Sequence, residues 1–196
     1  MKKITFIKSA LVYLTFGFST IFIVSCSNDQ KPEDTKVVAE DHNDAKFDNK
    51  KNEKDAQFLV NAAEINSEEI SLGQLAQKSG RTSHVKELGK MMEDAHTKSM
   101  ADLTVLAKTK IISLPTSQTE NGQIAYKKLN ETSGSDFGKE YSDLMVSAHK
   151  DAIALFEKAS TECTDPDIRV WASTMIPSLR THLDHSLMCQ KECEKI

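Results

Sequence analysis

The stretch DAQFLVNAAEINSEEISLGQLAQKSG, residues 55–80, decides the fold class of this chain. Its apolar side chains recur every three or four positions, which is the spacing of one face of an α-helix. We predict a helix from Asp55 to Ser79, with Gly80 in the left-handed conformation that often follows a helix. The residues of the repeating stripe are Phe58, Ala62, Ile65, Glu69, Leu72, Ala76 and Ser79.

Three further long stretches have the same helical period, at residues 83–106, 135–161 and 166–196. Asp165 followed by Pro166 is the preferred order of a capping residue and a first helical residue. The connection after residue 80 is so short that the first two helices must form an antiparallel hairpin.

The segment between Lys110 and Gly134 contains a shorter helical pattern at residues 117–131. A helix of about fourteen residues covers roughly 21 Å, and extended flanks add roughly 3.3 Å per residue, which is enough to return along a helical bundle. We therefore predict an all-α, ferritin-like antiparallel four-helix bundle over residues 55–196. Its two helical hairpins would be joined by a long crossover that contains the short helix.

The N-terminus has the features of a lipoprotein signal peptide. Residues 1–25 begin with two lysines and continue as a long apolar run. Ile23-Val24-Ser25-Cys26 resembles the bacterial lipobox, which implies cleavage before Cys26 and attachment of lipid to it. An uncleaved membrane anchor is the alternative. Because Ser27 stands where an aspartate would signal retention in the inner membrane, we expect an outer-membrane lipoprotein in the bacterial cell envelope, facing the periplasm or the cell surface.

Residues 26–54 are rich in charged and amide side chains and have no helical apolar period, so we expect a flexible polar tether. Residues 1–25 hold three of the 25 basic residues and no acidic residue, which leaves 22 basic against 29 acidic residues and a formal charge of −7. This balance argues against nucleic acid as a partner. The expected contact with the membrane is through the lipid.

His96, His149 and His182 lie near the midpoints of three predicted helices, and Glu69 lies near the midpoint of the fourth. A difference of two or three positions displaces a side chain by only roughly 3–5 Å along a helix, so the four side chains would share one level. A buried polar layer that fixes helix register is the first interpretation. A site for zinc, copper or nickel is the second.

A di-iron site would require Glu-x-x-His motifs from two helices. Only Glu93-x-x-His96 fits that pattern, and no acid precedes His149 by three residues, so iron is the weaker candidate. Overall we expect no cofactor, with zinc, copper, nickel and iron as the candidates if a metal is bound.

A second group of ligand-type side chains forms a stripe along the last helix. His182, His185, Cys189 and Cys193 are spaced by three, four and four residues. Imidazole and thiolate could hold copper or zinc, but a single helix cannot surround a metal, so a second chain in a homodimer or another segment would be needed. The alternatives are a Cys189–Cys193 disulfide, an intermolecular disulfide or free thiols.

Several short motifs are spread over residues 56–188. They are Ala62-Ala63-Glu64, Glu69-Ile70-x-Leu72-Gly73-x-Leu75-Ala76, Met91-Met92-x-x-x-His96-Thr97-Lys98, Leu114-Pro115, Tyr141, Val146-x-x-His149, Leu155-Phe156 and Pro177-x-Leu179-Arg180-x-His182-Leu183. Together they resemble a ferritin-like bacterial family of outer-membrane proteins of unknown function, some of them lipoproteins. The resemblance implies the fold and a location outside the cytoplasm, and it brings no established reaction.

No nucleophile motif, phosphate loop or nucleotide fingerprint is present in the sequence. We therefore expect a lipid-anchored envelope protein that acts as a binding or structural module and not as an enzyme. The alternative function is metal binding or metal-dependent redox chemistry, at the His/Glu layer or at the C-terminal His/Cys stripe.

Overall fold

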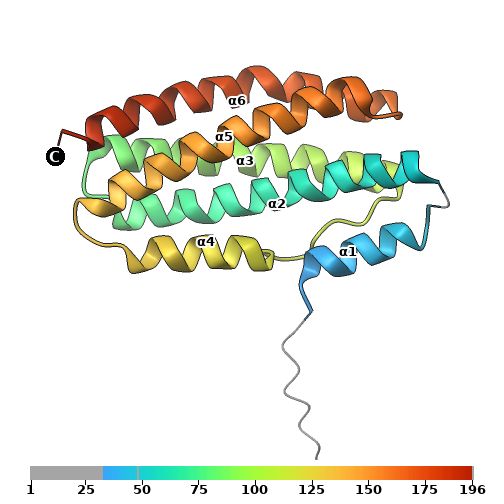
Figure 1. The fold of residues 1–196 in the computed structure, drawn as a ribbon, viewed down its shortest axis with the longest axis horizontal. Helices are drawn as coiled ribbons and strands as arrows, with labels where there is room; N and C mark the ends of the chain where they lie inside the picture. Colours follow the sequence, from blue (N-terminus) through green and yellow to red (C-terminus); the bar gives the residue numbers. More distant parts are fainter. Residues whose placement is uncertain (1–32, 48, 196) are drawn as a thin grey trace, which may run out of the picture. The chain divides into compact units, whose positions relative to one another are not determined.

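A computed structural model describes residues 33–47 and 49–195 of the chain (Figure 1). These residues form six α-helices and no strand, so the prediction of an all-α chain is confirmed for this part. The helices are α1 (Thr35–Asp44), α2 (Lys50–Ser79), α3 (Ser83–Lys110), α4 (Glu120–Glu131), α5 (Asp136–Glu162) and α6 (Pro166–Cys193).

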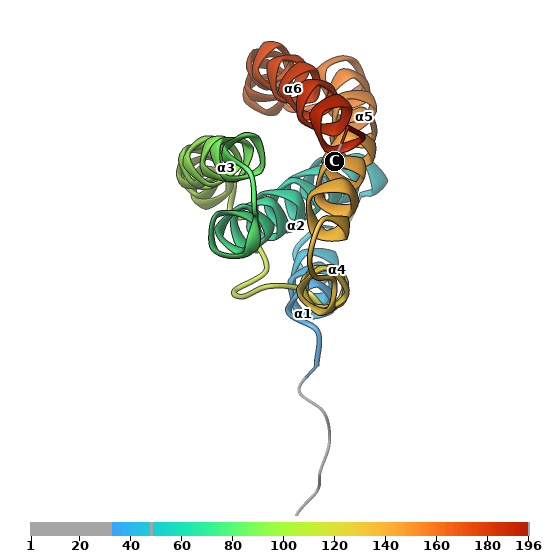
Figure 2. The same cartoon turned by 90° about the vertical axis from the view of Figure 1, so that its left-hand side faces the viewer.

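The four long helices pack as two antiparallel hairpins, α2 with α3 and α5 with α6 (Figure 1). The segment between the hairpins runs back along α2 and contains α4, so that α3 and α5 begin at the same end of the bundle. Viewed from the end, α2 lies between α3 and α5, and α3 also contacts α6 (Figure 2). The structure therefore contains the two hairpins and the connecting helix that the sequence predicts.

Side-chain caps fix where most of these helices begin. Asp165 accepts hydrogen bonds from the backbone N–H groups of Asp167 and Ile168, with Pro166 as the first helical residue, as predicted. Thr82 caps α3 and Thr119 caps α4 in the same way. Each cap satisfies N–H groups that have no partner within the helix.

Gly80 does not adopt the predicted left-handed conformation. Its φ is −62° and its ψ is 136°, which is extended backbone. A Cβ at this position would lie 2.5 Å from the carbonyl oxygen of Ala76 and 2.7 Å from Cγ1 of Val85. Glycine is therefore required here because α3 starts so close to the end of α2, and not because of a positive φ.

The expected flexible tether, residues 26–54, is wrong in its second half. Residues 35–44 form α1, and α2 begins at Lys50, five residues before the predicted start. Tertiary contacts order this polar segment: the buried amide of Asn43 donates to the carbonyl of Ser113 and accepts from its N–H, and Lys36 forms an ion pair with Glu64. These contacts are with distant parts of the chain, so the composition of the segment alone does not predict them.

The apolar core consists of two clusters arranged along the bundle. One includes Leu59, Leu103, Phe156 and Ile168, and the other includes Leu72, Met92, Phe137 and Met145. Within the described residues, none of the helices is both long and apolar enough to cross a bilayer. The expected signal peptide and Cys26 lie outside the described residues.

Candidate metal centre

A layer of buried polar side chains lies between the two apolar clusters. α2 contributes Asn66 and Glu69, α3 contributes His96, α5 contributes His149 and α6 contributes His182. Each of these residues is at most 5% exposed. Every long helix of the bundle therefore supplies at least one polar group to the same interior region.

The three histidine rings converge in this layer. The ring centroids of His96 and His149 are 5.7 Å apart, those of His96 and His182 are 5.4 Å apart, and those of His149 and His182 are 5.3 Å apart. One nitrogen from each ring can be chosen so that all three lie within 4.8 Å of one another. The sequence prediction that these histidines share a level in the bundle agrees with this geometry.

The nitrogen that points away from the other rings is held by a polar neighbour in each case. Nδ1 of His96 lies 2.9 Å from Oδ1 of Asn66, and Nδ1 of His149 lies 2.9 Å from the carbonyl oxygen of Met145. Nε2 of His182 lies 3.1 Å from Oγ of Ser178. Since carbonyl oxygens only accept hydrogen bonds, Nδ1–H of His96 and of His149 must donate, which leaves a lone pair on Nε2 of both rings. Nε2 of His149 faces Nδ1 of His182 at 3.3 Å, and Nε2 of His96 has no hydrogen-bond partner in the described residues.

Burial keeps all three imidazoles neutral near pH 7. It lowers the pKa of His96 well below the usual value, and the neighbouring His149 and His182 add to this effect. Burial also lowers the pKa of His149, against the hydrogen bond to Met145, and it lowers the pKa of His182 to about 4. Neutral imidazole is the form that binds a metal.

Glu69 lies beside His149 and not among the converging nitrogens. Its Oε1 is 3.6 Å from Nδ1 of His149, the nitrogen that already donates to Met145. Burial raises the pKa of Glu69 to about 8, and the charge of Glu68 adds to this effect. At pH 7 the Glu69–His149 contact therefore joins two neutral groups. The hydrogen bond to Met145, and not Glu69, therefore fixes the orientation of the His149 ring.

Several buried polar atoms around the layer have no hydrogen-bond partner in the described part of the chain. They are Nε2 of His96, Oε2 of Glu69, Nδ2 of Asn66, the hydroxyl of Tyr141 and, outside the layer, Nε1 of Trp171. A buried polar atom without a partner costs about 1–3 kcal/mol. Three of these five atoms belong to residues of the polar layer, Asn66, Glu69 and His96.

Glu93, predicted as a site residue, does not reach the layer. It is partly exposed and accepts hydrogen bonds from the side chains of Gln74 and Gln77 on α2. A residue three positions before His96 lies about 60° away around the helix, and this rotation places its carboxylate at the surface edge of the α2–α3 contact. The Glu93-x-x-His96 pattern therefore does not form a carboxylate–histidine pair.

The C-terminal stripe does not converge into a metal-sized group within residues 33–47 and 49–195. His185 is exposed, Cys189 is buried, and Cys193 is partly exposed. Both cysteines and Cys163 are free thiols. Burial raises the pKa of Cys189 to about 12, with Cys193 adding to the effect, so this thiol stays protonated at neutral pH.

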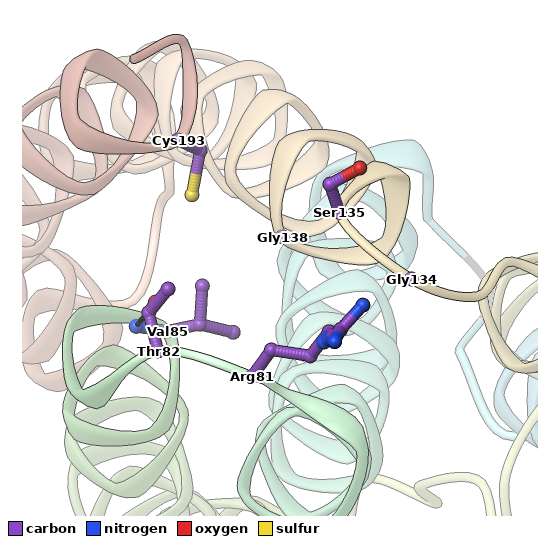
Figure 3. Close-up of a pocket in the computed structure, with 7 residues that line it drawn as sticks. All are labelled: Arg81, Thr82, Val85, Gly134, Ser135, Gly138 and Cys193. Atoms are coloured by element: carbon purple, nitrogen blue, oxygen red, sulfur yellow. Dashed lines mark hydrogen bonds between the residues drawn. The ribbon is translucent and has the colours of Figure 1, made fainter. Parts of the chain in front are cut away.

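Cys193 lines a cavity of about 380 Å³ at one end of the bundle. Its sulfur points toward Val85 of α3 and lies beside Gly138 of α5, while Arg81 and Ser135 lie farther along the wall (Figure 3). The other stripe residues His185 and Cys189 line a different cavity with Met91 and Met188. The stripe is thus divided between two cavities.

Three residues that complete the layer are missing from the sequence prediction: Asn66, Ser178 and Tyr141. Asn66 lies three positions before Glu69, and Ser178 lies four positions before His182, which are the spacings of neighbours on one helix face. That spacing is a usable signal. Tyr141 lies eight positions before His149, two turns along the same face of α5, so its position is a weaker signal of the same kind. Burial, and then the charge of Glu69, raise the pKa of Tyr141.

Comparison with known proteins gives a family but no activity. Nothing among curated proteins matches this chain, and nothing among solved structures matches it. One family model matches residues 41–187, which is most of the chain and includes all five residues of the polar layer. The chain therefore belongs to the family described as a domain of unknown function (DUF4142).

Proposed function

We propose that this protein binds one transition-metal ion at the layer formed by His96, His149 and His182. The observation that carries the proposal is the arrangement of nitrogens: each ring is held from behind by a polar neighbour, and its other nitrogen faces the same small region. This is how proteins commonly orient metal-binding histidines.

The distance between two of the facing nitrogens fits a shared metal ion. Nε2 of His149 and Nδ1 of His182 are 3.3 Å apart, a distance that a weak hydrogen bond between the rings also permits. Two nitrogens bound to one tetrahedral zinc ion at its usual bond length would be roughly 3.3–3.4 Å apart. A nitrogen of His96 lies within 4.8 Å of ligand nitrogens on both other rings, so it can complete the set if the rings move closer together.

The donor set favours zinc or copper, with nickel as a further candidate. Three neutral imidazoles suit all three ions, and a three-histidine zinc site keeps a fourth position for water or another ligand. A di-iron centre needs several carboxylates. In the described part of the chain, the layer includes only one carboxyl group, that of Glu69, and this group lies on the side of His149 away from the other two rings.

The proposal also includes the cellular setting. A lipid on Cys26 would hold the bundle in the bacterial cell envelope, most simply at the outer membrane. The two hairpins and the crossover support a ferritin-like assignment of the bundle. With 22 basic and 29 acidic residues after the signal, the protein would contact the membrane through its lipid and would not bind nucleic acid.

Metal content of the purified full chain tests the proposal. The protein is stripped with a chelator, dialysed against Zn²⁺ or Cu²⁺, and analysed for bound metal. We expect one ion per chain, and we expect His96→Ala, His149→Ala or His182→Ala to abolish it. His84→Ala and His185→Ala are matched controls because both residues are exposed.

Melting temperature separates this function from the competing one, in which the layer only fixes helix register. An ion present at about 100 times its Kd stabilises the fold by about 2.7 kcal/mol, or about 5–10 °C in a domain of this size. We expect this increase in the unmodified chain and in the controls. Loss of stability in the three layer variants, with no metal bound by any of the proteins, would support a purely structural layer.

A further inference from the structure

We infer that a cleft between α2 and α5 is the route by which the metal cation reaches the histidine layer. This inference rests on the proposed metal function. The cleft has a volume of about 320 Å³, with acidic side chains from Glu68, Glu69 and Asp151 and apolar walls that include Ile65 and Leu155.

The inner end of the cleft is Glu69. This residue is 2% exposed, it lines the cleft, and its Oε2 has no hydrogen-bond partner in the described residues. Its other oxygen lies 3.6 Å from Nδ1 of His149, and Ala148, the neighbour of His149 along the chain, also lines the cleft. Glu69 therefore contacts both the cleft and the layer.

The outer end of the cleft carries two more carboxylates. Asp151 is exposed and Glu68 is partly exposed. Within residues 33–47 and 49–195, neither carboxylate forms a hydrogen bond or an ion pair, so nothing neutralises them locally. Burial, and secondarily the charge of Glu64, raise the pKa of Glu68.

Other cavities do not offer a comparable route. The cavity at Cys193, the cavity at His185 and the cavity near Asp55 are lined by none of the five layer residues. They also lie beside the ends of the long helices, whereas Glu69 and Ala148 lie near the middle. Of these four cavities, the α2–α5 cleft is the one that reaches the layer.

The order of carboxylates along the cleft suggests how the ion would move. Asp151 and Glu68 attract it from solvent, and Glu69 receives it at the inner end. The last step needs a rotation of Glu69 or of the His149 ring, because Nε2 of His149, which faces His182, lies on the ring edge opposite the one that faces Glu69. The outer carboxylates would therefore affect the rate at which the metal ion is taken up, and the histidines would determine the affinity for the bound ion.

The experiment measures uptake of Co²⁺ alone by the metal-free full chain in a stopped-flow instrument, because the visible absorption of Co²⁺ reports nitrogen coordination. The test variant is Glu68→Gln/Asp151→Asn. The matched control is Glu131→Gln/Asp184→Asn, which removes the same charges from exposed positions that do not line the cleft. Equilibrium titrations with Co²⁺ are run on all three proteins.

We expect the association rate of the test variant to fall about 3- to 10-fold at low ionic strength, because local charge steers ions toward a site. The difference should shrink at about 0.3 M salt, where exposed charges are screened. The control should match the unmodified chain, and the final stoichiometry should be one ion in all three proteins.

Two outcomes overturn different claims. If the chain binds Co²⁺ but the test variant takes it up as fast as the control, the route is wrong and the metal site stands. If the unmodified chain binds no Co²⁺ at either salt concentration, the proposed function itself is wrong and the route falls with it.

Discussion

Burial shifts the pKa of Glu69 and the pKa values of the three histidines in opposite directions, because it disfavours the charged form of each group. The raised pKa of Glu69, about 8, means that the folded state holds a proton that the unfolded state releases above about pH 4.5. The lowered histidine pKa values mean that the unfolded state binds protons, below about pH 6.5, that the folded state does not. Stability of the metal-free protein should therefore rise with pH because of the histidines and fall with pH because of Glu69.

Only Glu69, of these four groups, changes its protonation between pH 6.5 and 8. We expect the free energy of unfolding of the metal-free protein to fall by about 1–2 kcal/mol across this range, since one proton contributes about 1.4 kcal/mol per pH unit. Glu69→Gln should remove the decline, and Glu93→Gln, at the surface, should keep it. Urea unfolding at pH 6.5, 7.2 and 8 measures the free energy of unfolding of each protein. If this free energy still falls with pH in Glu69→Gln, another group is responsible.

At the scale of elements, two glycines set the separation of α2 and α3. A Cβ on Gly73 would lie 2.5 Å from the carbonyl oxygen of Gly89, and a Cβ on Gly89 would lie 2.7 Å from that of Gly73. The two backbones therefore touch at this point. The close approach also brings Asn66 of α2 within hydrogen-bond distance of His96 of α3, so helix packing and site geometry depend on the same contact.

We expect Gly73→Ala to lower the free energy of unfolding by about 1–3 kcal/mol, because the added methyl group overpacks a backbone contact and outweighs the helix propensity of alanine. Gly122→Ala on α4 is the matched control. Its Cβ would meet only the flexible side chain of Gln118, so stability should stay the same or rise slightly. Chemical denaturation measures the free energy of unfolding of both variants. Equal values for Gly73→Ala and Gly122→Ala would contradict the proposed role of the glycine contact.

At the scale of the whole molecule, the candidate site exists only when both hairpins have docked. α2 and α3 supply Asn66 and His96, whereas α5 and α6 supply His149 and His182. The two apolar clusters lie on either side of the polar layer and include residues of both hairpins. Burial of these clusters offsets the cost of the polar groups between them. Metal affinity and global folding should therefore be linked.

The proposed membrane attachment would also act on the whole molecule, since a lipid on Cys26 would tether the complete bundle. We expect radiolabelled palmitate to be incorporated by the full chain in a bacterial host and to be lost in Cys26→Ala, because Cys26 is the proposed acceptor. Cys163→Ala is the matched control, as that thiol is buried in the bundle. Label that survives Cys26→Ala would contradict the lipoprotein assignment.

The helices could be predicted from the sequence because their signals are local. Residues 55–79 show the helical period, Asp165-Pro166 marks a helix start, and the midpoint positions of three histidines predict a shared level. The predicted ends at residues 79, 131 and 161 lie within one residue of those observed for α2, α4 and α5, and Asp165 caps α6 as predicted. These features depend on neighbours within one helical turn or on counting residues along a helix, so no knowledge of the packing is needed.

The tertiary structure decided what depends on contacts between distant segments. It ordered α1 through Asn43 and Lys36, required Gly80 for a close approach, turned Glu93 to the surface, and placed Glu69 behind His149. The physical reason is the limited precision of a helical pattern. The pattern predicts which face of a helix is buried, but with an uncertainty of about one residue position around the helix. The rotation and separation of the packed helices then decide which nitrogen or oxygen atoms meet in the interior.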